Sequence, residues 1–414
     1  MTETSESSLR PSSPRRLSRR ALVGGAVTAA LAAAVPARAY ARPAPGSFPS
    51  RPSPLPLPSL PSLPSLNTKA LQAAIDDLEH PRATGAQLRV GGAAGRWYGT
   101  SGVADLRSGR AIRTGDQVRA GSISKAFIAT VVLQLVREGR LRLDGPVQRY
   151  LPGLLPAKYP EIRLSHLLTH TSGLPDASGP DQPDLSTPEQ ILAHRYDRLT
   201  PARLLARVTR TKGMKFDPGA RQEYRGTNFL LLAMVVERVT GRSYGAEIHR
   251  RIARPLGLTG TSVPASDDPY LHGPHVHGYQ EMSDGRLEDA TVYNQSAAYG
   301  SGEVVSTTRD LETFLAALFA GELLPPSLLE HMFTLPPPEV LMVDGTPARY
   351  SAGLQTVTVN GVPFWGKTGE RYGYNSGAFG TRDRKLRMVW SYTPVRRDAE
   401  QGRMAERIAA ALTS

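Results

Sequence analysis

A serine and a lysine three residues apart are the side chains of this sequence best suited to nucleophilic chemistry. Ser122 and Lys125 start a segment, residues 122–138, whose apolar spacing predicts a buried helix, and both side chains share one face of it. The chain has only seven lysines against 43 arginines, and burying an ammonium is costly unless it has a partner or a task. The pattern therefore predicts that Lys125 activates Ser122 as a nucleophile, at the positive end of a helix.

Three later segments accompany this pair. They are IRLSHLLTHTSGLP at residues 162–175, EYRGTNF at 223–229 and WGKTGE at 365–370. In this order and spacing, the four segments resemble the penicillin-recognising serine hydrolases, the family of class C β-lactamases, D-alanyl-D-alanine carboxypeptidases and related esterases. The resemblance runs from about residue 71 to residue 392, and secreted serine DD-peptidases are the most similar members.

The resemblance implies roles for the residues that react. Ser122 would be the acylated nucleophile and Lys125 its hydrogen-bonded activator. Tyr224 would pass a proton to the leaving group, which needs a pKa lowered by neighbouring cations. The backbone N–H groups of Ser122 and Glu370 would form the oxyanion hole. No metal or cofactor takes part.

The resemblance also implies a substrate-binding strand. Lys367, Thr368 and Gly369 would lie on an edge strand that faces Ser122. Lys367 would supply positive potential and Thr368 a hydroxyl for a substrate carboxylate. Gly369 would let the substrate backbone approach and pair with the strand.

Two positions depart from the family pattern. Gly226 stands where the Tyr-x-Asn motif has an asparagine that holds the substrate amide, and Asn228, two residues later, is expected to point elsewhere. Gln355 stands where the peptidases have an arginine for the terminal carboxylate, which leaves Lys367 to bind it. Both departures weaken the prediction of a D-Ala-D-Ala substrate more than that of the nucleophile.

The elements expected around the site define an α+β, β-lactamase/transpeptidase-like fold. An antiparallel sheet is built from both ends of the domain, with helices on both faces and an all-α lobe inserted between. The domain spans 67–414, with the sheet lobe at about 67–135 and 295–414 and the helical lobe at about 136–294. Strands are predicted within 86–103, joined near residues 91–92, and at 353–359, 362–365, 375–381 and 386–392. Helices are predicted at 69–78, 122–138, 201–208, 229–239, 307–319 and 397–412.

The first 66 residues indicate export. Residues 1–41 have a basic start, paired arginines at 19 and 20, an Ala-rich apolar run to Val35, and small residues before cleavage near Ala39 or Ala41. This plan is typical of a twin-arginine signal, and the run is shorter than the roughly 20 apolar residues of a membrane span. The Pro/Ser/Leu-rich residues 42–66 read as an extended linker. Nearly half of the net charge of +13 lies in these two segments.

Other functional classes fit less well. The chain has no cysteine, which excludes a thiolate nucleophile, a disulfide scaffold and a lipoprotein anchor. The Gly-x-Ser-x-Gly match at 241–245 follows a helix rather than a strand, so Ser243 is interpreted as a helix cap. His272, His275 and His277 lie in a Gly/Pro loop without a carboxylate ligand pattern, which does not favour a metal site. Scattered arginines without interleaved aromatic residues do not indicate nucleic-acid binding.

The sequence thus predicts a secreted serine hydrolase that works through an acyl-enzyme on Ser122. The leading substrate is the peptidoglycan stem peptide of the cell wall, cleaved in the manner of a D-alanyl-D-alanine carboxypeptidase, with β-lactams as acylating mimics. Two alternatives stay open: a β-lactamase or esterase on the same site, and a catalytically weak protein that binds β-lactams or muropeptides. No stable membrane span is expected after signal removal.

Overall fold

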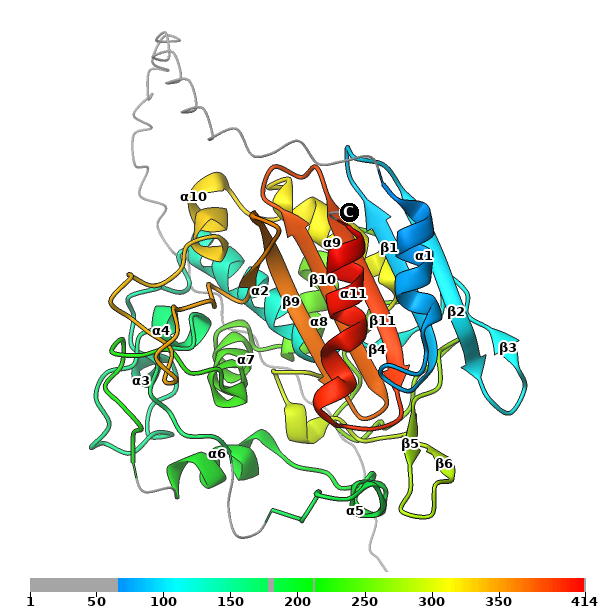
Figure 1. Cartoon of the computed structure of the whole chain (residues 1–414). Helices are drawn as coiled ribbons and strands as arrows, with labels where there is room; N and C mark the ends of the chain where they lie inside the picture. Colours follow the sequence, from blue (N-terminus) through cyan, green and yellow to red (C-terminus); the bar gives the residue numbers. More distant parts are fainter. Residues whose placement is uncertain (1–65, 178–181, 211–212, 413–414) are drawn as a thin grey trace, which may run out of the picture. The chain divides into compact units, whose positions relative to one another are not determined.

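An antiparallel sheet joins the two ends of the domain. The computed structural model describes residues 66–177, 182–210 and 213–412. The predicted export signal, and the predicted linker up to residue 65, lie outside the described residues. The sheet has seven strands in the order β3 (Arg110–Ala111), β2 (Trp97–Asp105), β1 (Ala83–Gly91), β11 (Arg387–Pro394), β10 (Tyr374–Thr381), β9 (Val362–Arg371) and β8 (Gln355–Val359). The pairing of β1 with β11, with Leu88 opposite Trp390, confirms a sheet built from both ends (Figure 1).

Helices cover both faces of this sheet, as predicted. The helices α1 (Thr68–Asp76) and α11 (Arg403–Ala411) pack on each other and on one face, where Leu71, Ile75 and Ile408 are almost fully buried. The helix α9 (Thr308–Phe319) covers the other face, and its Phe314 stacks on Phe127 of α2 (Ser124–Arg137) at 3.8 Å between ring centroids. This stack connects the helix that follows Ser122 to the sheet lobe.

The lobe inserted between the two halves of the sheet is mainly helical. Its longest helix, α7 (Gly226–Thr240), contacts α2, and Tyr224 lies two residues before the first residue of α7. The other helical elements are α3 (Val147–Tyr150), α4 (Leu164–Leu168), α5 (Pro188–Ala193), α6 (Pro201–Thr209), α8 (Tyr244–Ile248) and the π turn η2 (His249–Ala253). Thr200 caps α6 by accepting a hydrogen bond from the Arg203 N–H, and Gly241 ends α7 in the left-handed conformation.

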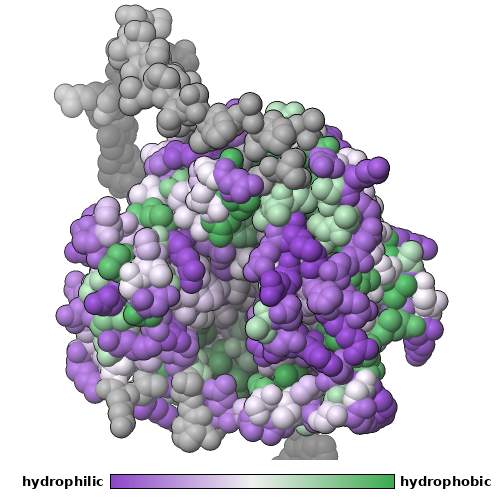
Figure 2. All heavy atoms as spheres, in the orientation of Figure 1, coloured by the Kyte–Doolittle hydropathy of each residue, from purple (hydrophilic) through white to green (hydrophobic). Residues whose placement is uncertain are grey.

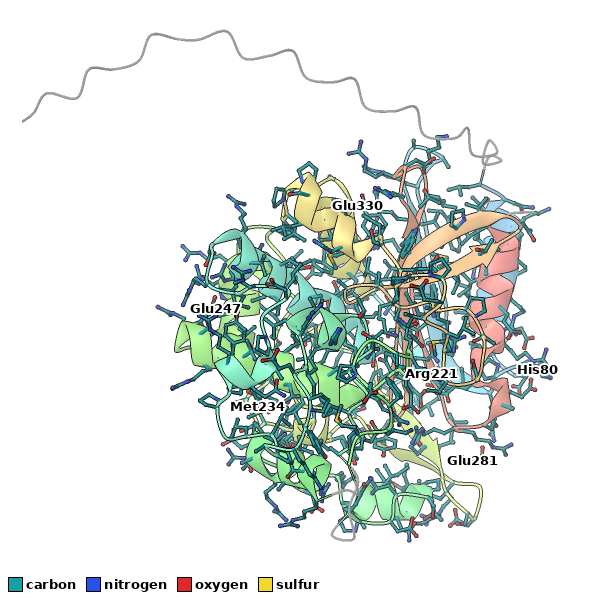
Figure 3. All side chains as sticks on the ribbon, turned by 90° about the vertical axis from the view of Figure 1, so that its left-hand side faces the viewer. His80, Arg221, Met234, Glu247, Glu281 and Glu330 are labelled. Atoms are coloured by element: carbon teal, nitrogen blue, oxygen red, sulfur yellow. The ribbon has the colours of Figure 1, made fainter. Side chains whose placement is uncertain are left out.

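The insertion ends in a hairpin that the sequence did not predict. Strands β5 (Tyr279–Glu281) and β6 (Leu287–Asp289) have three residues each, too few to show an alternating pattern. Glu281 forms ion pairs with Arg82 and Arg396, and Figure 3 shows Glu281 beside the end of the sheet lobe. The hairpin therefore closes one end of the sheet.

Short elements complete the described chain. Strands β4 (Val118–Arg119) and β7 (Val305–Ser306) pair next to the site, and the 3-10 turn η1 (Gly121–Ile123) leads into α2. The remaining elements are η3 (Ser296–Ala298), α10 (Pro326–Leu329), η4 (Glu330–Met332) and η5 (Ala399–Gly402). Among the described residues, no helix has the length and apolar character needed to cross a membrane. Figure 2 shows a face of the molecule that is hollowed between the helical lobe and the sheet lobe.

Candidate active site

Ser122 and Lys125 meet at the start of α2. Lys125 Nζ donates hydrogen bonds to Ser122 Oγ at 2.9 Å and to the backbone oxygen of Ser301 at 2.6 Å. Lys125 is only 2% exposed, whereas Ser122 is partly exposed and lines a cavity. The structure thus brings the predicted pair together: the accessible hydroxyl of Ser122 accepts a hydrogen bond from the buried amine of Lys125.

The environment of Lys125 favours its neutral form. Burial holds the pKa of Lys125 well below its ordinary value, and the nearby positive charges of Lys367 and Arg371 lower it further. Among the described residues, Lys125 forms no ion pair with a carboxylate that would restore the charge. A neutral amine carries a lone pair that can accept the proton of Ser122.

Tyr224 lies between the two lysines of the site. The centroid of its ring is 5.0 Å from Lys125 Nζ and 4.7 Å from Lys367 Nζ. Its buried hydroxyl makes no hydrogen bond of standard geometry in the described part of the chain, although it lies near enough to Ser122 for that contact to lower its pKa.

The prediction that neighbouring cations lower the pKa of Tyr224 is wrong. Burial raises the pKa of Tyr224 well above its ordinary value and outweighs the lowering contributions of Ser122 and Arg371. The two lysines are themselves buried and held toward neutrality, so they offer little charge to stabilise a phenolate. Burial thus favours the phenol form of Tyr224, and Lys125 is the amine in hydrogen-bond contact with Ser122 Oγ.

The strand that carries Lys367, Thr368 and Gly369 is an edge strand over half of its length only. β8 pairs with residues 362–366 of β9, where Gln355 lies opposite Gly366. Residues 367–371 extend beyond β8 and pair only with β10 on the other side. The edge prediction is thus wrong for the first half of β9 and confirmed for the half that faces the site.

Lys367 is held by the residue that departs from the family pattern. Its Nζ donates to Gln355 Oε1 at 2.8 Å, and the side chain is almost fully buried. Burial and the nearby Arg349 charge lower the pKa of Lys367 to about 7. Lys367 thus carries a full positive charge only below neutral pH.

Two glycines let η1 and β9 approach closely. A Cβ on Gly369 would lie 1.9 Å from the backbone oxygen of Ala120 and 3.1 Å from the Ser122 nitrogen, and one on Gly121 would lie 2.5 Å from the Glu370 nitrogen. Side chains at either position would force the two segments apart. The backbone nitrogens of Ser122 and Glu370, predicted to form the oxyanion hole, are thus brought to one junction.

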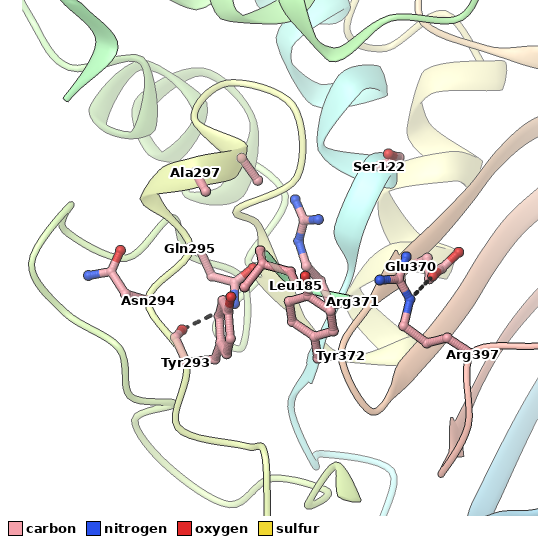
Figure 4. Close-up of a pocket in the computed structure, with 11 residues that line it drawn as sticks. Ser122, Leu185, Tyr293, Asn294, Gln295, Ala297, Glu370, Arg371, Tyr372 and Arg397 are labelled. Atoms are coloured by element: carbon pink, nitrogen blue, oxygen red, sulfur yellow. Dashed lines mark hydrogen bonds and ion pairs between the residues drawn. The ribbon is translucent and has the colours of Figure 1, made fainter. Parts of the chain in front are cut away.

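A cavity of about 320 Å³ opens beside Ser122 (Figure 4). Its wall combines residues of the β9 end with the loop before η3, and the lining is Ser122, Leu185, Tyr293, Asn294, Gln295, Ala297, Ala298, Glu370, Arg371, Tyr372 and Arg397. Tyr224, Lys367 and Thr368 lie outside this lining. The cavity therefore extends from the nucleophile on the side away from the two lysines.

Gly226, at the asparagine position of the Tyr-x-Asn motif, and Asn228, two residues later, lie in different surroundings. Asn228 is buried in the helical lobe, where its side chain bonds to Ser172 Oγ at 2.5 Å and to His170 Nδ1 at 3.1 Å, so it points elsewhere as expected. Gly226 lies at the start of α7, where an added Cβ would contact Ser301 Oγ at 3.4 Å. A longer side chain at position 226 would therefore extend next to Ser301, whose backbone oxygen binds Lys125.

We expect Gly226→Asn to raise the acylation rate of amide or β-lactam substrates by roughly tenfold, because a side-chain amide would add a hydrogen-bond partner for the substrate. The measurement is kcat/KM on a D-Ala-D-Ala peptide and the acylation rate with a penicillin. Gly226→Ala, which adds the Cβ alone, is the control. An unchanged or lower rate would contradict the argument.

Several functional contacts were missed at the level of sequence. Ser301 supplies a backbone oxygen to Lys125 across 176 positions, Gln355 accepts a hydrogen bond from Lys367, and Arg371 lines the same cavity as Ser122. The one available signal was Gly300 and Gly302 on either side of Ser301, which indicate an unusual backbone.

Ser243 and the three histidines of the 272–277 loop each have a hydrogen-bond partner within the chain. Ser243 caps α8 by accepting from the Ala246 N–H at 3.1 Å, as interpreted. His272 bonds to Asp268, His277 to Asp289 and His275 to the Gly273 oxygen, so the three rings serve different partners. Among the described residues, no group of three or more His, Asp or Glu side chains is arranged to hold a metal ion.

An antiparallel sheet between helices, with a Ser-x-x-Lys pair facing its edge, defines a serine hydrolase of the β-lactamase and penicillin-binding protein class. A family model described as Beta-lactamase matches residues 71–413, and the chain belongs to this family. It is 28% identical over 283 residues to Penicillin-binding protein 4* of Bacillus subtilis (strain 168), covering 64% of this chain and 59% of that protein. It is 32% identical over 195 residues to Esterase EstB of Burkholderia gladioli, which covers 44% of this chain and 48% of that protein. The chain spans about half the length of the curated relatives it matches.

Solved structures match over more of the chain. A D-stereospecific amidohydrolase from Streptomyces sp. superposes with a TM-score of 0.71 at 34% identity, covering 82% of this chain and 97% of that one. A D-amino acid amidase from Ochrobactrum anthropi SV3 superposes with a TM-score of 0.69 at 26% identity, covering 83% and 97%. These matches confirm the predicted fold class.

Proposed function

We propose that this chain is an exported hydrolase that forms an acyl-enzyme on Ser122 and cleaves the bond after a D-residue, in the manner of a D-alanyl-D-alanine carboxypeptidase. Peptidoglycan stem peptides are its substrate class, and β-lactams acylate the same serine. The observation that carries the proposal is the 2.9 Å contact between Ser122 Oγ and the buried Lys125 amine. The likeness to a D-stereospecific amidohydrolase and to a D-amino acid amidase supports the D-configuration of the substrate.

In this mechanism Ser122 Oγ attacks the substrate carbonyl carbon while its proton passes to neutral Lys125. The N–H groups of Ser122 and Glu370 stabilise the oxyanion. When the C–N bond breaks, the leaving amine takes a proton from the phenol of Tyr224, which regains it from Lys125. Water then attacks the ester carbonyl carbon while one of its protons passes to neutral Lys125, the bond from the acyl carbon to Ser122 Oγ breaks, and Lys125 returns that proton to Ser122 Oγ as the acid leaves.

Labelling with a fluorescent penicillin tests this proposal. We expect the mature protein to gain one covalent adduct, detected by intact mass, and Ser122→Ala to gain none. Equal labelling of the Ser122→Ala variant, or no labelling of the wild type, would overturn the nucleophile assignment. The same sample of exported protein gives the N-terminus, expected after Ala39 or Ala41.

A second candidate is a D-amino acid amidase or esterase, whose substrates lack a terminal carboxylate on the leaving half. The bond from Lys367 to Gln355 favours it, because a lysine with a pKa of about 7 and an existing partner is a weak receptor for a carboxylate. Initial rates on a D-Ala-D-Ala peptide, a D-amino acid amide, a p-nitrophenyl ester and nitrocefin separate the candidates. A stable adduct with negligible turnover would instead identify a weakly catalytic β-lactam-binding protein.

The pKa of Lys367 predicts a pH dependence for carboxylate substrates. Since that pKa is lowered to about 7, Lys367 is protonated below neutral pH and loses its charge as the pH rises. We expect KM for a D-Ala-D-Ala peptide to rise severalfold between about pH 6 and pH 8, and KM for a neutral ester to stay flat. Equal pH profiles for the two substrates would show that Lys367 does not bind the carboxylate.

A further inference from the structure

The guanidinium of Arg371 is held in the cavity wall by backbone and not by an acid. Arg371 Nε donates to the Gly302 oxygen at 2.9 Å. A Cβ on Gly302 would lie 1.7 Å from Arg371 Nη2, so the glycine is what leaves room for the guanidinium against this loop. Among the described residues, Arg371 forms no ion pair with a carboxylate, and its two terminal nitrogens keep their donors for another group.

The charges of Glu303 and Glu370 act on Arg371, but in the part of the chain that the structure describes neither acid forms an ion pair with its guanidinium. Glu370 is paired with Arg397, whose Nε lies 3.0 Å from Glu370 Oε1. Glu303 is buried, its carboxylate accepts hydrogen bonds from Tyr244 and from the Gly300 N–H, and burial raises its pKa to about 7. The cavity beside Ser122 therefore contains a guanidinium whose recorded bond, among the described residues, is to a backbone oxygen and not to a carboxylate.

The position of the cavity indicates which half of the substrate reaches Arg371. Tyr224, which protonates the leaving amine in the proposed mechanism, and Lys367, which is predicted to bind the terminal carboxylate of the leaving half, lie outside the lining. The cavity instead passes along the end of β9 toward Tyr293 and Tyr372, whose ring centroids are 4.8 Å apart. Figure 4 shows the Arg371 guanidinium between Ser122 and these rings. This is the space left for the acyl half.

We propose that Arg371 binds a carboxylate on the acyl half of the substrate, so that the enzyme prefers acyl groups with an anionic substituent. A guanidinium matches a carboxylate with two parallel hydrogen bonds, and partial burial strengthens them. This group is distinct from any terminal carboxylate on the leaving half. The inference rests on the proposed acyl-enzyme function and names the substrate class of that same site.

Two penicillins provide a matched pair of probes. Carbenicillin differs from benzylpenicillin by one carboxylate on the acyl side chain, next to the amide carbonyl. We measure the rate constant of acylation for each by intact mass, in the wild type and in Arg371→Gln. The glutamine places an N–H donor where Arg371 Nε lies, so it can keep the bond to Gly302 and removes only the charged fork.

The expected result is a preference for carbenicillin, relative to benzylpenicillin, that falls by roughly tenfold in Arg371→Gln. Arg371→Lys should keep part of the preference, since it keeps the charge. Arg396→Met removes an exposed cation near the same end of the sheet, outside the cavity lining, and should leave the preference unchanged.

The outcomes distinguish this inference from the function on which it rests. Adducts could form in both proteins with the same ratio of the carbenicillin to the benzylpenicillin acylation rate. That result would overturn the role of Arg371 and leave the acyl-enzyme function intact. Absence of any adduct in the wild type would overturn both. If Arg371→Gln fails to fold, the wild type alone decides: acylation by carbenicillin that is no faster than acylation by benzylpenicillin would overturn the inference, because the proposed contact must favour the acyl group that carries the carboxylate.

Discussion

Lys125→Met should lower the rate of Ser122 acylation by about a thousandfold. Removal of a general base at a nucleophilic serine costs on the order of 10²- to 10⁴-fold, and burial lowers the pKa of Lys125, the base that we propose. The measurement is the rate of penicillin adduct formation by intact mass. The melting temperature should stay the same or rise, because the variant removes a buried amine that lacks a carboxylate partner.

The variant Lys125→Arg distinguishes a role of Lys125 as a proton acceptor from a role as a positive charge. A guanidinium keeps the positive charge but does not lose its proton in a protein, so this variant should be as slow as Lys125→Met. Lys385→Met, at an exposed lysine paired with Asp383, is the matched control and should acylate at the wild-type rate. Wild-type acylation in Lys125→Arg would show that Lys125 acts by its charge and that another group takes the proton.

The parts of this site that the sequence predicts are those encoded locally. Ser122 and Lys125 are one helical turn apart, so their contact follows from the geometry of a helix start. The paired strands of the two chain ends follow from apolar alternation and from the resemblance to a known family. For Gly369 the sequence predicts room for the substrate backbone, whereas in the structure the missing side chain makes room for Ala120 and Ser122 of the chain itself.

The parts that it does not predict depend on distant contacts. The Ser301 oxygen that binds Lys125 and the Gln355 oxygen that binds Lys367 come from segments whose approach is decided only by the packed fold. The pKa of Tyr224 was predicted in the wrong direction because a count of nearby cations ignores desolvation, which dominates for a buried hydroxyl. The edge character of β9 depended on how far β8 extends, and a short strand leaves little pattern.

Gly369→Ala should lower the rate of Ser122 acylation by at least about a hundredfold, because it displaces a donor of the proposed oxyanion hole. The new Cβ would lie 1.9 Å from the Ala120 oxygen, so η1 and β9 must separate, and with them the Ser122 and Glu370 N–H groups. Loss of one such donor costs roughly 10²- to 10³-fold in kcat. The overpacking should also lower the free energy of unfolding by ~1–3 kcal/mol.

The control for this second prediction lies on the same strand. Gly366→Ala would place a Cβ 2.0 Å from the Ala378 oxygen of β10, so it meets a comparable collision within the sheet and away from η1. Both variants should be destabilised to a similar extent in urea, but only Gly369→Ala should lose acylation well below its own unfolding transition. Gly115→Ala, with no heavy atom within 4 Å of its Cβ, should match the wild type in both measurements. Equal loss of acylation in the Gly366 and Gly369 variants would mean that strand stability, and not the junction of Ser122 with Glu370, sets the rate, because both glycines then act through the same property of β9.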